Sequence, residues 1–266
     1  MKLHRLDSNN GHFYQVGEKE YPSSTTILHK AYPLEPGLKM FLQNNSKEEA
    51  TKVMEGAGLS GTKVHHAIDL MLQGSNLLPT GFTDEDIDNT GLTDNILIKY
   101  LREPFNKKED YALRGFMNWC QKFNPIPIKT EMIVWSDEYQ YAGTLDFLGY
   151  IHNPDKQLVI IDWKTGKGLY KEYDLQLASY WGALGECQGL DWKTDAYLVQ
   201  LGINKCGFKM VQLKDLKSNL EEFYNIKKTF DFLYPGYKPS IYEYADEYAV
   251  KINQDLVKQE LTKFKL

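Results

Sequence analysis

The chain has 266 residues, of which 42% are hydrophobic and 25% charged, with a formal net charge of −5 at pH 7. This length suits one large domain, and no apolar run approaches the roughly 20 residues that span a bilayer. An acidic chain does not have the basic character of a protein that binds nucleic acid through bulk charge alone, although a basic groove can coexist with an acidic remainder.

The cysteines give no sign of a metal cluster or of a secreted protein. Cys120, Cys187 and Cys206 lie far apart and form no C-x-x-C motif, which argues against a zinc or iron–sulfur site and against a disulfide framework. The N-terminus "MKLHRLDSNNGHFYQV" has no apolar signal-peptide core. We therefore expect a cytoplasmic protein with no membrane association.

The N-terminal quarter of the chain predicts a hairpin followed by helices. Residues 10–22 have the pattern of a hairpin with a glycine in its turn, and Ser23 or Ser24 is placed to cap a short helix. Residues 36–55 are predicted to be mostly helical, and the "GAG" sequence at 56–58 is expected to end that helix.

A second helix is expected over residues 61–72, with Ser60 as its N-cap. Its apolar positions recur at helical spacing and form one face, made by Val64, Ile68, Met71 and Leu72. His65 lies beside this face, and His66 lies about 100° further round the helix.

The rest of the chain predicts a polar insertion and then an alternating core. Residues 74–107 are expected to form the insertion, with a helix near 93–104. The elements that follow are a helix at 108–123, strands at 128–137, 139–151 and 157–164, a helix at 171–186, strands at 194–203 and 206–213, and charged helices at 215–231 and 243–264. The central order is therefore αβββαβ, and the absence of an internal repeat predicts a single domain over residues 1–266.

The sequence "LVIIDWKTGK" at 158–167 combines a buried strand with charges at its end. Residues two apart on a strand point to the same face, so the Asp162 carboxylate and the Lys164 ammonium are expected to be neighbours. The alternative is that they form the solvated end of an ordinary strand.

Asp146, on the preceding strand, is a candidate partner for Asp162. A loop at 153–155 would place the two aspartates opposite each other, whereas a loop at 154–155 would place Asp146 opposite Trp163 unless a bulge intervened. Two adjacent carboxylates repel each other, so one must be protonated or both must bind a cation. Oxygen ligands of this kind favour Mg²⁺ or Mn²⁺.

Other polar residues have little meaning when each is taken alone. His65 alone is typical of a partly buried helix histidine, Gln176 and Tyr180 are typical of the surface and edge of a helix, and Glu131 alone indicates almost nothing.

Together these residues resemble the PD-(D/E)XK nuclease superfamily in its RecB-like branch. The motifs that carry the resemblance are "GTKVH" (61–65), "YAGTLDFLGY" (141–150), "IIDWKTGK" (160–167) and "LQLASYW" (175–181). They are similar to motifs of phage exonucleases of this branch and of the mitochondrial genome maintenance exonuclease. The implied fold is α/β (α+β): a restriction-endonuclease-like core at about 58–215, with a mixed sheet flanked by helices, a helical N-terminal segment at 20–57 and C-terminal helices at 215–266.

The resemblance also implies roles for individual residues. Asp146, Asp162 and Lys164 would be catalytic, and Glu131, Thr165, Gln176 and Tyr180 would be supporting or DNA-binding residues. The metal ligands would be His65, Asp146, Asp162 and the main-chain carbonyl of Trp163.

The implied activity is that of a Mg²⁺- or Mn²⁺-dependent deoxyribonuclease. Its substrate would be DNA, single-stranded or with free ends, cleaved as an exonuclease by a metal-activated water. Some relatives carry a cysteine cluster for an iron–sulfur centre, which this sequence does not have, so that cofactor is not expected. The alternatives are an endonuclease, a nucleic-acid-binding protein of the same fold without catalysis, and a carboxylate-pair enzyme such as a glycosidase.

Overall fold

The computed structural model describes residues 3–8, 10–90, 95–189 and 194–240. Its strands are β1 (Leu3–Ser8), β2 (Gly11–Val16), β3 (Lys19–Pro22), β4 (Ile126–Ser136), β5 (Tyr141–His152), β6 (Lys156–Lys164), β7 (Asp195–Ile203) and β8 (Gly207–Gln212). Its helices are α1 (Ser24–Ala31), α2 (Pro36–Asn44), α3 (Lys47–Leu72), α4 (Asp84–Thr90), α5 (Asn95–Arg102), α6 (Lys107–Phe123), α7 (Lys171–Gln188) and α8 (Leu216–Leu233).

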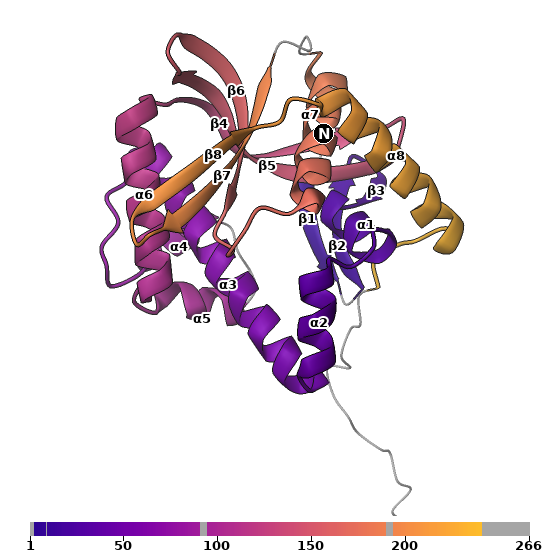
Figure 1. Ribbon diagram of the computed structural model, residues 1–266, viewed down its shortest axis with the longest axis horizontal. Helices are drawn as coiled ribbons and strands as arrows, with labels where there is room; N and C mark the ends of the chain where they lie inside the picture. The colour runs from indigo at the N-terminus through magenta and orange to yellow at the C-terminus, as the bar shows by residue number, and fades with distance from the viewer. Residues whose placement is uncertain (1–2, 9, 91–94, 190–193, 241–266) are drawn as a thin grey trace, which may run out of the picture.

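A five-stranded mixed sheet forms the centre of the molecule, with the strand order β4-β5-β6-β7-β8 (Figure 1). Strands β4, β5 and β6 pair antiparallel, and helix α7 then returns the chain so that β7 pairs parallel to β6. Together with α3, these elements give the predicted αβββαβ order. The predicted fold class, a mixed sheet flanked by helices, is confirmed.

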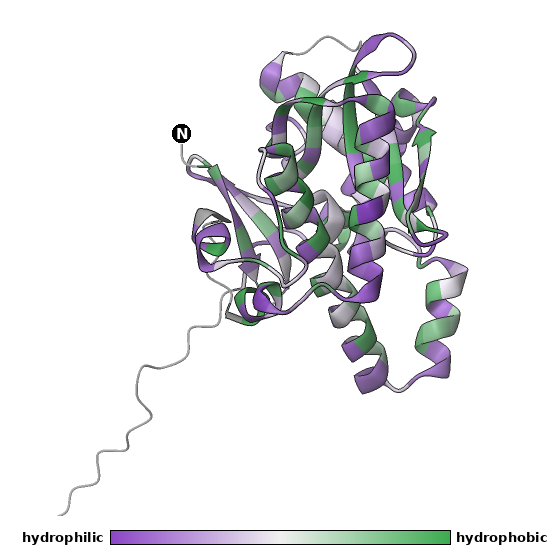
Figure 2. Ribbon diagram, turned by 90° about the vertical axis from the view of Figure 1, so that its left-hand side faces the viewer, coloured by the Kyte–Doolittle hydropathy of each residue, from purple (hydrophilic) through white to green (hydrophobic). Residues whose placement is uncertain are grey.

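Helices cover both faces of this sheet, so its central strand β6 is buried on both sides. Ile160 belongs to a core cluster that includes Leu177 of α7 and Phe223 of α8. Ile161 and Trp163 belong to the cluster on the opposite face, which includes side chains of α3 and α6. Figure 2 shows hydrophobic residues along the central strands, between helices whose visible surfaces carry many hydrophilic residues. The aliphatic run before Asp162 is therefore a doubly buried strand, as its sequence predicted.

Helix α3 differs from the prediction because it is continuous. Ser46 caps it, and a reciprocal capping box with Glu49 fixes its first turn. The glycines at 56–58 lie inside the helix and Ser60 is not a cap, so both predicted boundaries were wrong. The strong cap at Ser46 and the buried face around Val64 outweigh the helix-interior cost of about 1 kcal/mol for each glycine.

The other predicted elements agree with the structure within a few residues, except that the helical region expected over 36–55 is divided at residues 45–46 and that α4 was not predicted. The hairpin at 10–22 and the Ser23 cap are confirmed, but an additional strand, β1, completes a three-stranded sheet that the sequence did not predict. The helix expected at 243–264 lies outside the described residues. None of the helices in the described part of the chain combines the length and apolar character needed to cross a bilayer.

The continuous α3 predicts that Gly56→Ala and Gly58→Ala stabilise the fold. A Cβ atom at either position would meet no other atom within 4 Å, so each alanine is expected to add about 0.5–1 kcal/mol to the free energy of unfolding. Urea unfolding followed by circular dichroism measures this change. Gly115→Ala is the control, since its Cβ would lie 2.7 Å from the carbonyl oxygen of Gly207 and should destabilise the fold. Loss of stability in the α3 variants would contradict a continuous helix.

Candidate metal centre

The candidate site lies where β5 and β6 separate. Their pairing runs from His152↔Lys156 to Phe147↔Ile161, so the loop is 153–155 and Asp146 comes opposite Asp162 one position further on. This is the register that the sequence required for an aspartate pair. Beyond the last pair, Asp146 Oδ2 accepts a 2.7 Å hydrogen bond from the main-chain N–H of Trp163, so a carboxylate extends the strand pairing.

Helix α3 and strand β4 bring two further side chains to Asp146. His65, Glu131 and Asp146 each offer a ligand atom, and these atoms lie within 4.8 Å of one another. His65 Nδ1 lies 3.3 Å from Asp146 Oδ1 and 4.0 Å from Glu131 Oε1. At the opposite edge of the His65 imidazole, Nε2 lies 3.1 Å from the carbonyl oxygen of Trp163.

This donor set fits a divalent cation. One imidazole and two carboxylates are ligands that suit Mn²⁺, and the carboxylates also suit Mg²⁺. Asp146 is buried, while the side chains of His65 and Glu131 are 25% and 31% exposed, so an ion could enter from solvent. The structure thus brings together the predicted residues His65 and Asp146 and the carbonyl of Trp163. Glu131, which was expected to be a supporting residue, offers a ligand atom in the same cluster as His65 and Asp146.

Asp162 lies beside this group but faces Lys164. The Lys164 ammonium is 2.6 Å from Asp162 Oδ2, and it donates a 2.8 Å hydrogen bond to Gln176 Oε1. Asp162 Oδ2 is buried and accepts no hydrogen bond of good geometry from the residues that the structure describes, so it retains capacity for a further positive partner. A direct ligand role for Asp162 stays a prediction.

Helix α7 holds Lys164 through a short relay. Gln176 Nε2 donates a 2.7 Å hydrogen bond to the hydroxyl of Tyr180, one turn later on the helix. The Lys164 ammonium also lies 4.4 Å from the ring centroid of Tyr173. Gln176 and Tyr180 were expected from the sequence. Tyr173 was missed, although its position one turn before Gln176 on the same helix face could have indicated it.

The pKa values of the site reflect crowded negative charge in a buried place. Burial lowers the pKa of His65, but the neighbouring carboxylates, Asp146 above all, outweigh it and raise the pKa to about 9. Burial raises the pKa of Glu131, and the charge of Asp146 raises it further. Burial also raises the pKa of Asp162, against the opposing charge of Lys164. A bound cation would relieve this repulsion, which is the physical reason that the site favours one.

Glu131 has an unusual backbone conformation for a strand residue. Its φ is +45°, in the left-handed region that non-glycine residues rarely adopt, at a cost of about 1–3 kcal/mol. Such conformations persist only where the surrounding structure enforces them, and they are frequent at functional sites. Sequence reasoning placed Glu131 in a supporting role, because a single acidic residue in a strand gives no signal of strain.

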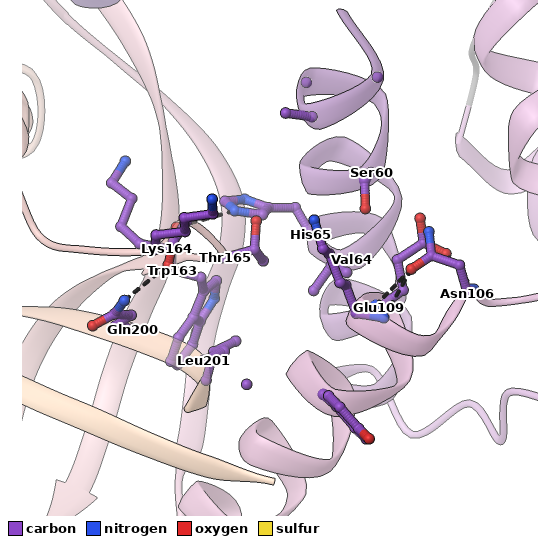
Figure 3. A pocket seen from close by; sticks show the side chains of 18 of the residues that line it. Ser60, Val64, His65, Asn106, Glu109, Trp163, Lys164, Thr165, Gln200 and Leu201 are labelled. Atoms are coloured by element: carbon purple, nitrogen blue, oxygen red, sulfur yellow. Dashed lines mark hydrogen bonds between the residues drawn. The ribbon is translucent and has the colours of Figure 1, made fainter. Parts of the chain in front are cut away.

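A groove of about 1140 Å³ adjoins the metal ligands (Figure 3). Its walls come from α3, the start of α6, the segment after β6 and the end of β7, and His65 extends from α3 towards Lys164 and Thr165. Three exposed lysines line it: Lys52, Lys108 and Lys167. Val53 and Met54 add exposed apolar surface, with exposed fractions of 57% and 48%.

A buried lysine fixes one wall of this groove. Lys63 is fully buried and donates hydrogen bonds to the carbonyl oxygens of Tyr100 and Glu103, with Glu109 3.9 Å away. These contacts attach the segment that joins α5 and α6 to helix α3. The point of attachment, Lys63, is two residues before His65 in the sequence. Sequence reasoning missed Lys63, whose only signal is a charged residue among the apolar positions of a helix.

The comparisons with known proteins give little further information. No protein-family model and no curated protein sequence matches the chain. Among solved structures, the chain is similar to a crystal structure described as a "Putative exonuclease" from Eubacterium rectale, with 15% identity, a TM-score of 0.39, and coverage of 75% of this chain and 78% of that one. A likeness this distant carries no argument about activity, so the function has to be inferred from the site itself.

The carboxylate cluster predicts that Mn²⁺ or Mg²⁺ stabilises the protein through His65, Glu131 and Asp146. At a concentration 100 times the Kd, one bound ion adds about 2.7 kcal/mol to the free energy of unfolding. Asp146→Asn keeps an acceptor for the Trp163 N–H but loses the charge that binds the ion, so this increase should disappear.

Thermal unfolding with and without the ion measures the effect. Asp84→Asn is the matched control, because Asp84 is exposed and forms an ion pair with Arg102 on α5. An equal increase in Tm for Asp146→Asn and the wild type would contradict a metal site in this cluster.

Proposed function

We propose that this protein is a divalent-metal-dependent deoxyribonuclease that hydrolyses phosphodiester bonds, and that it belongs to the RecB-like branch of the PD-(D/E)XK nucleases. The observation that supports this most directly is the gathering of His65, Glu131 and Asp146 beside the Asp162–Lys164 ion pair at the end of a buried strand. We also propose that residues 1–266 form one nuclease domain.

In this proposal the metal is held by His65, Asp146 and the Trp163 carbonyl, with Glu131 and Asp162 completing the carboxylate shell. The bound ion would activate water and neutralise charge on the phosphate. The main-chain contacts of Trp163 keep two of the ligands in place, because its N–H binds Asp146 and its carbonyl binds His65.

Lys164 supplies a fixed positive charge. Burial lowers its pKa, but the adjacent Asp162 and Asp146 carboxylates outweigh burial, and its pKa is raised. The side chain therefore stays an ammonium at neutral pH, and its role is to donate hydrogen bonds to the attacking water or to the developing phosphoryl charge rather than to act as a base. Gln176 and Tyr180 keep this ammonium in position.

The groove supports a single strand of DNA as substrate. Its lysines suit a chain of phosphates, and this local positive charge contrasts with the net charge of −5 of the whole chain. The exposed side chains of Val53 and Met54 suit the faces of unpaired bases, which a duplex keeps stacked. Attack at free ends, as an exonuclease, follows from the resemblance of the sequence motifs, and the alternative is an endonuclease.

The proposed mechanism predicts that Lys164→Met lowers kcat by about two to three orders of magnitude, because it removes a charged donor next to the reacting phosphate. Asp162→Asn should have a similar effect. Release of labelled nucleotides from linear single-stranded DNA with Mn²⁺ or Mg²⁺ measures activity.

Lys156→Met is the matched control, since Lys156 lies at the other end of the same strand against Tyr150. Full activity of Lys164→Met would contradict the mechanism. Cleavage that persists in EDTA would contradict the metal, while no cleavage by the wild type would favour a binding protein without catalysis. Rapid cutting of closed circular strands would favour the endonuclease alternative.

The groove predicts that a triple variant, Lys52→Gln, Lys108→Gln and Lys167→Gln, binds single-stranded DNA more weakly and with less dependence on salt. Loss of three phosphate contacts should reduce the slope of log K against log salt by about 2. Fluorescence anisotropy over a salt series measures this slope. The control changes three exposed lysines on or near α8, Lys214, Lys217 and Lys228, and the same weakening in both triple variants would contradict binding in the groove.

A further inference from the structure

The small N-terminal sheet is attached to the strand that carries Asp146. The hydroxyl of Tyr14 on β2 shares a 2.8 Å hydrogen bond with Thr144 on β5, two residues before Asp146. Ser23, directly after β3, forms a bridge with Ala142 of the same strand. The position of this sheet relative to the metal ligands is therefore fixed by contacts with β5.

Arg5 lies on the side of the small sheet that faces these contacts. In the antiparallel register of β1 and β2, Arg5 is directly opposite Tyr14, and opposed residues place their side chains on the same side of a sheet. Asp7 holds the guanidinium, because Arg5 Nε donates to Asp7 Oδ1 at 2.8 Å. His12 Nδ1 lies 2.5 Å from the same carboxylate oxygen and 3.0 Å from Arg5 Nη2, so it either donates to Asp7 or accepts from Arg5. The side chain is 46% exposed, so it can contact a ligand from solvent.

Arg5 approaches the centre from a different part of the fold than two of the groove lysines, Lys108 and Lys167. Lys108 lies at the start of α6 and Lys167 follows β6, whereas Arg5 comes from β1, and Figure 1 shows α6 and the small sheet to either side of α3. A strand that lies in the groove and crosses the metal ligands would continue towards Arg5. A guanidinium suits this position because it is always charged and presents a planar fork of five N–H donors to a phosphate, of which the contacts with Asp7 and His12 use only part.

We propose that Arg5 binds a backbone phosphate of the substrate on the opposite side of the scissile bond from Lys108 and Lys167, and so fixes the strand across the metal centre. This inference rests on the proposed nuclease function. Asp7 and His12 orient the guanidinium. The alternative role is structural, in which Arg5 only offsets the charge of nearby carboxylates within the fold.

The test pairs variants of Arg5 with substrates in which one phosphate at a time is replaced by an uncharged methylphosphonate. For the wild type, replacing the phosphate that contacts Arg5 should lower kcat/KM by roughly tenfold to a hundredfold, the effect of losing a charge-assisted contact. Arg5→Gln should lower kcat/KM on unmodified DNA by a similar factor. Replacing the phosphate that contacts Arg5 should not lower kcat/KM of this variant any further. Arg5→Lys, which keeps the charge without the fork, should fall between them.

Lys19→Gln is the matched control, because Lys19 is an exposed cation of the same small sheet, paired with Asp137. Lys19→Gln should leave unchanged the way in which kcat/KM depends on the position of the methylphosphonate. The Tm of each variant detects a structural effect, which would lower activity equally on all the substrates.

The outcomes separate this inference from the proposed function. If the wild type cleaves DNA and Arg5→Gln keeps the wild-type methylphosphonate profile, or loses activity equally at every position, the Arg5 inference is overturned. If the wild type does not cleave at all, the nuclease proposal fails. The Arg5 inference is then decided by the affinity for the same oligonucleotides, measured by fluorescence anisotropy in EDTA. The affinity of Arg5→Gln should not change when the phosphate at one position is replaced by methylphosphonate. If Arg5→Gln and the wild type depend on the position of the methylphosphonate in the same way, the inference is overturned.

Discussion

The mutual repulsion of carboxylates is the constraint on which the site depends. Asp146 and Asp162 come opposite each other at the end of the β5–β6 pairing, and Glu131 joins them from β4. Bringing such charges into a buried place is costly unless each has a positive partner. The protein supplies two partners, His65 to Asp146 and Lys164 to Asp162, and the remaining negative charge fits a divalent cation.

The fold provides this arrangement through its buried central strand. Because β6 is covered on both faces, its end cannot move far, and the Trp163 ring in the core fixes the peptide group that binds Asp146 and His65. Helix α7, which returns the chain for the parallel strand β7, places Gln176 beside Lys164. The same elements, β6 and α7, therefore determine both the packing of the sheet and the geometry of the site.

The core of the fold could be predicted from the sequence because periodicity is a local signal, and the candidate site residues were predicted from the resemblance of their motifs to a nuclease superfamily. The sequence left a 153–155 loop or a bulge as the ways to place Asp146 beside Asp162, and the register shows the loop. The unbroken α3 could not be predicted, since glycines inside a helix are outweighed by a cap and by packing that only the folded chain reveals. The strain at Glu131 and the burial of Lys63 likewise depend on distant partners, which no local pattern specifies.

The central claim is that one divalent cation binds among His65, Glu131 and Asp146. Anomalous diffraction from crystals grown with Mn²⁺ tests it most directly, because the signal locates the ion without reference to activity. The account predicts a peak within about 2.0–2.6 Å of ligand atoms of these residues, the range of metal–ligand bonds in proteins. A fully occupied Mn²⁺ peak elsewhere, with none at this cluster, would contradict it.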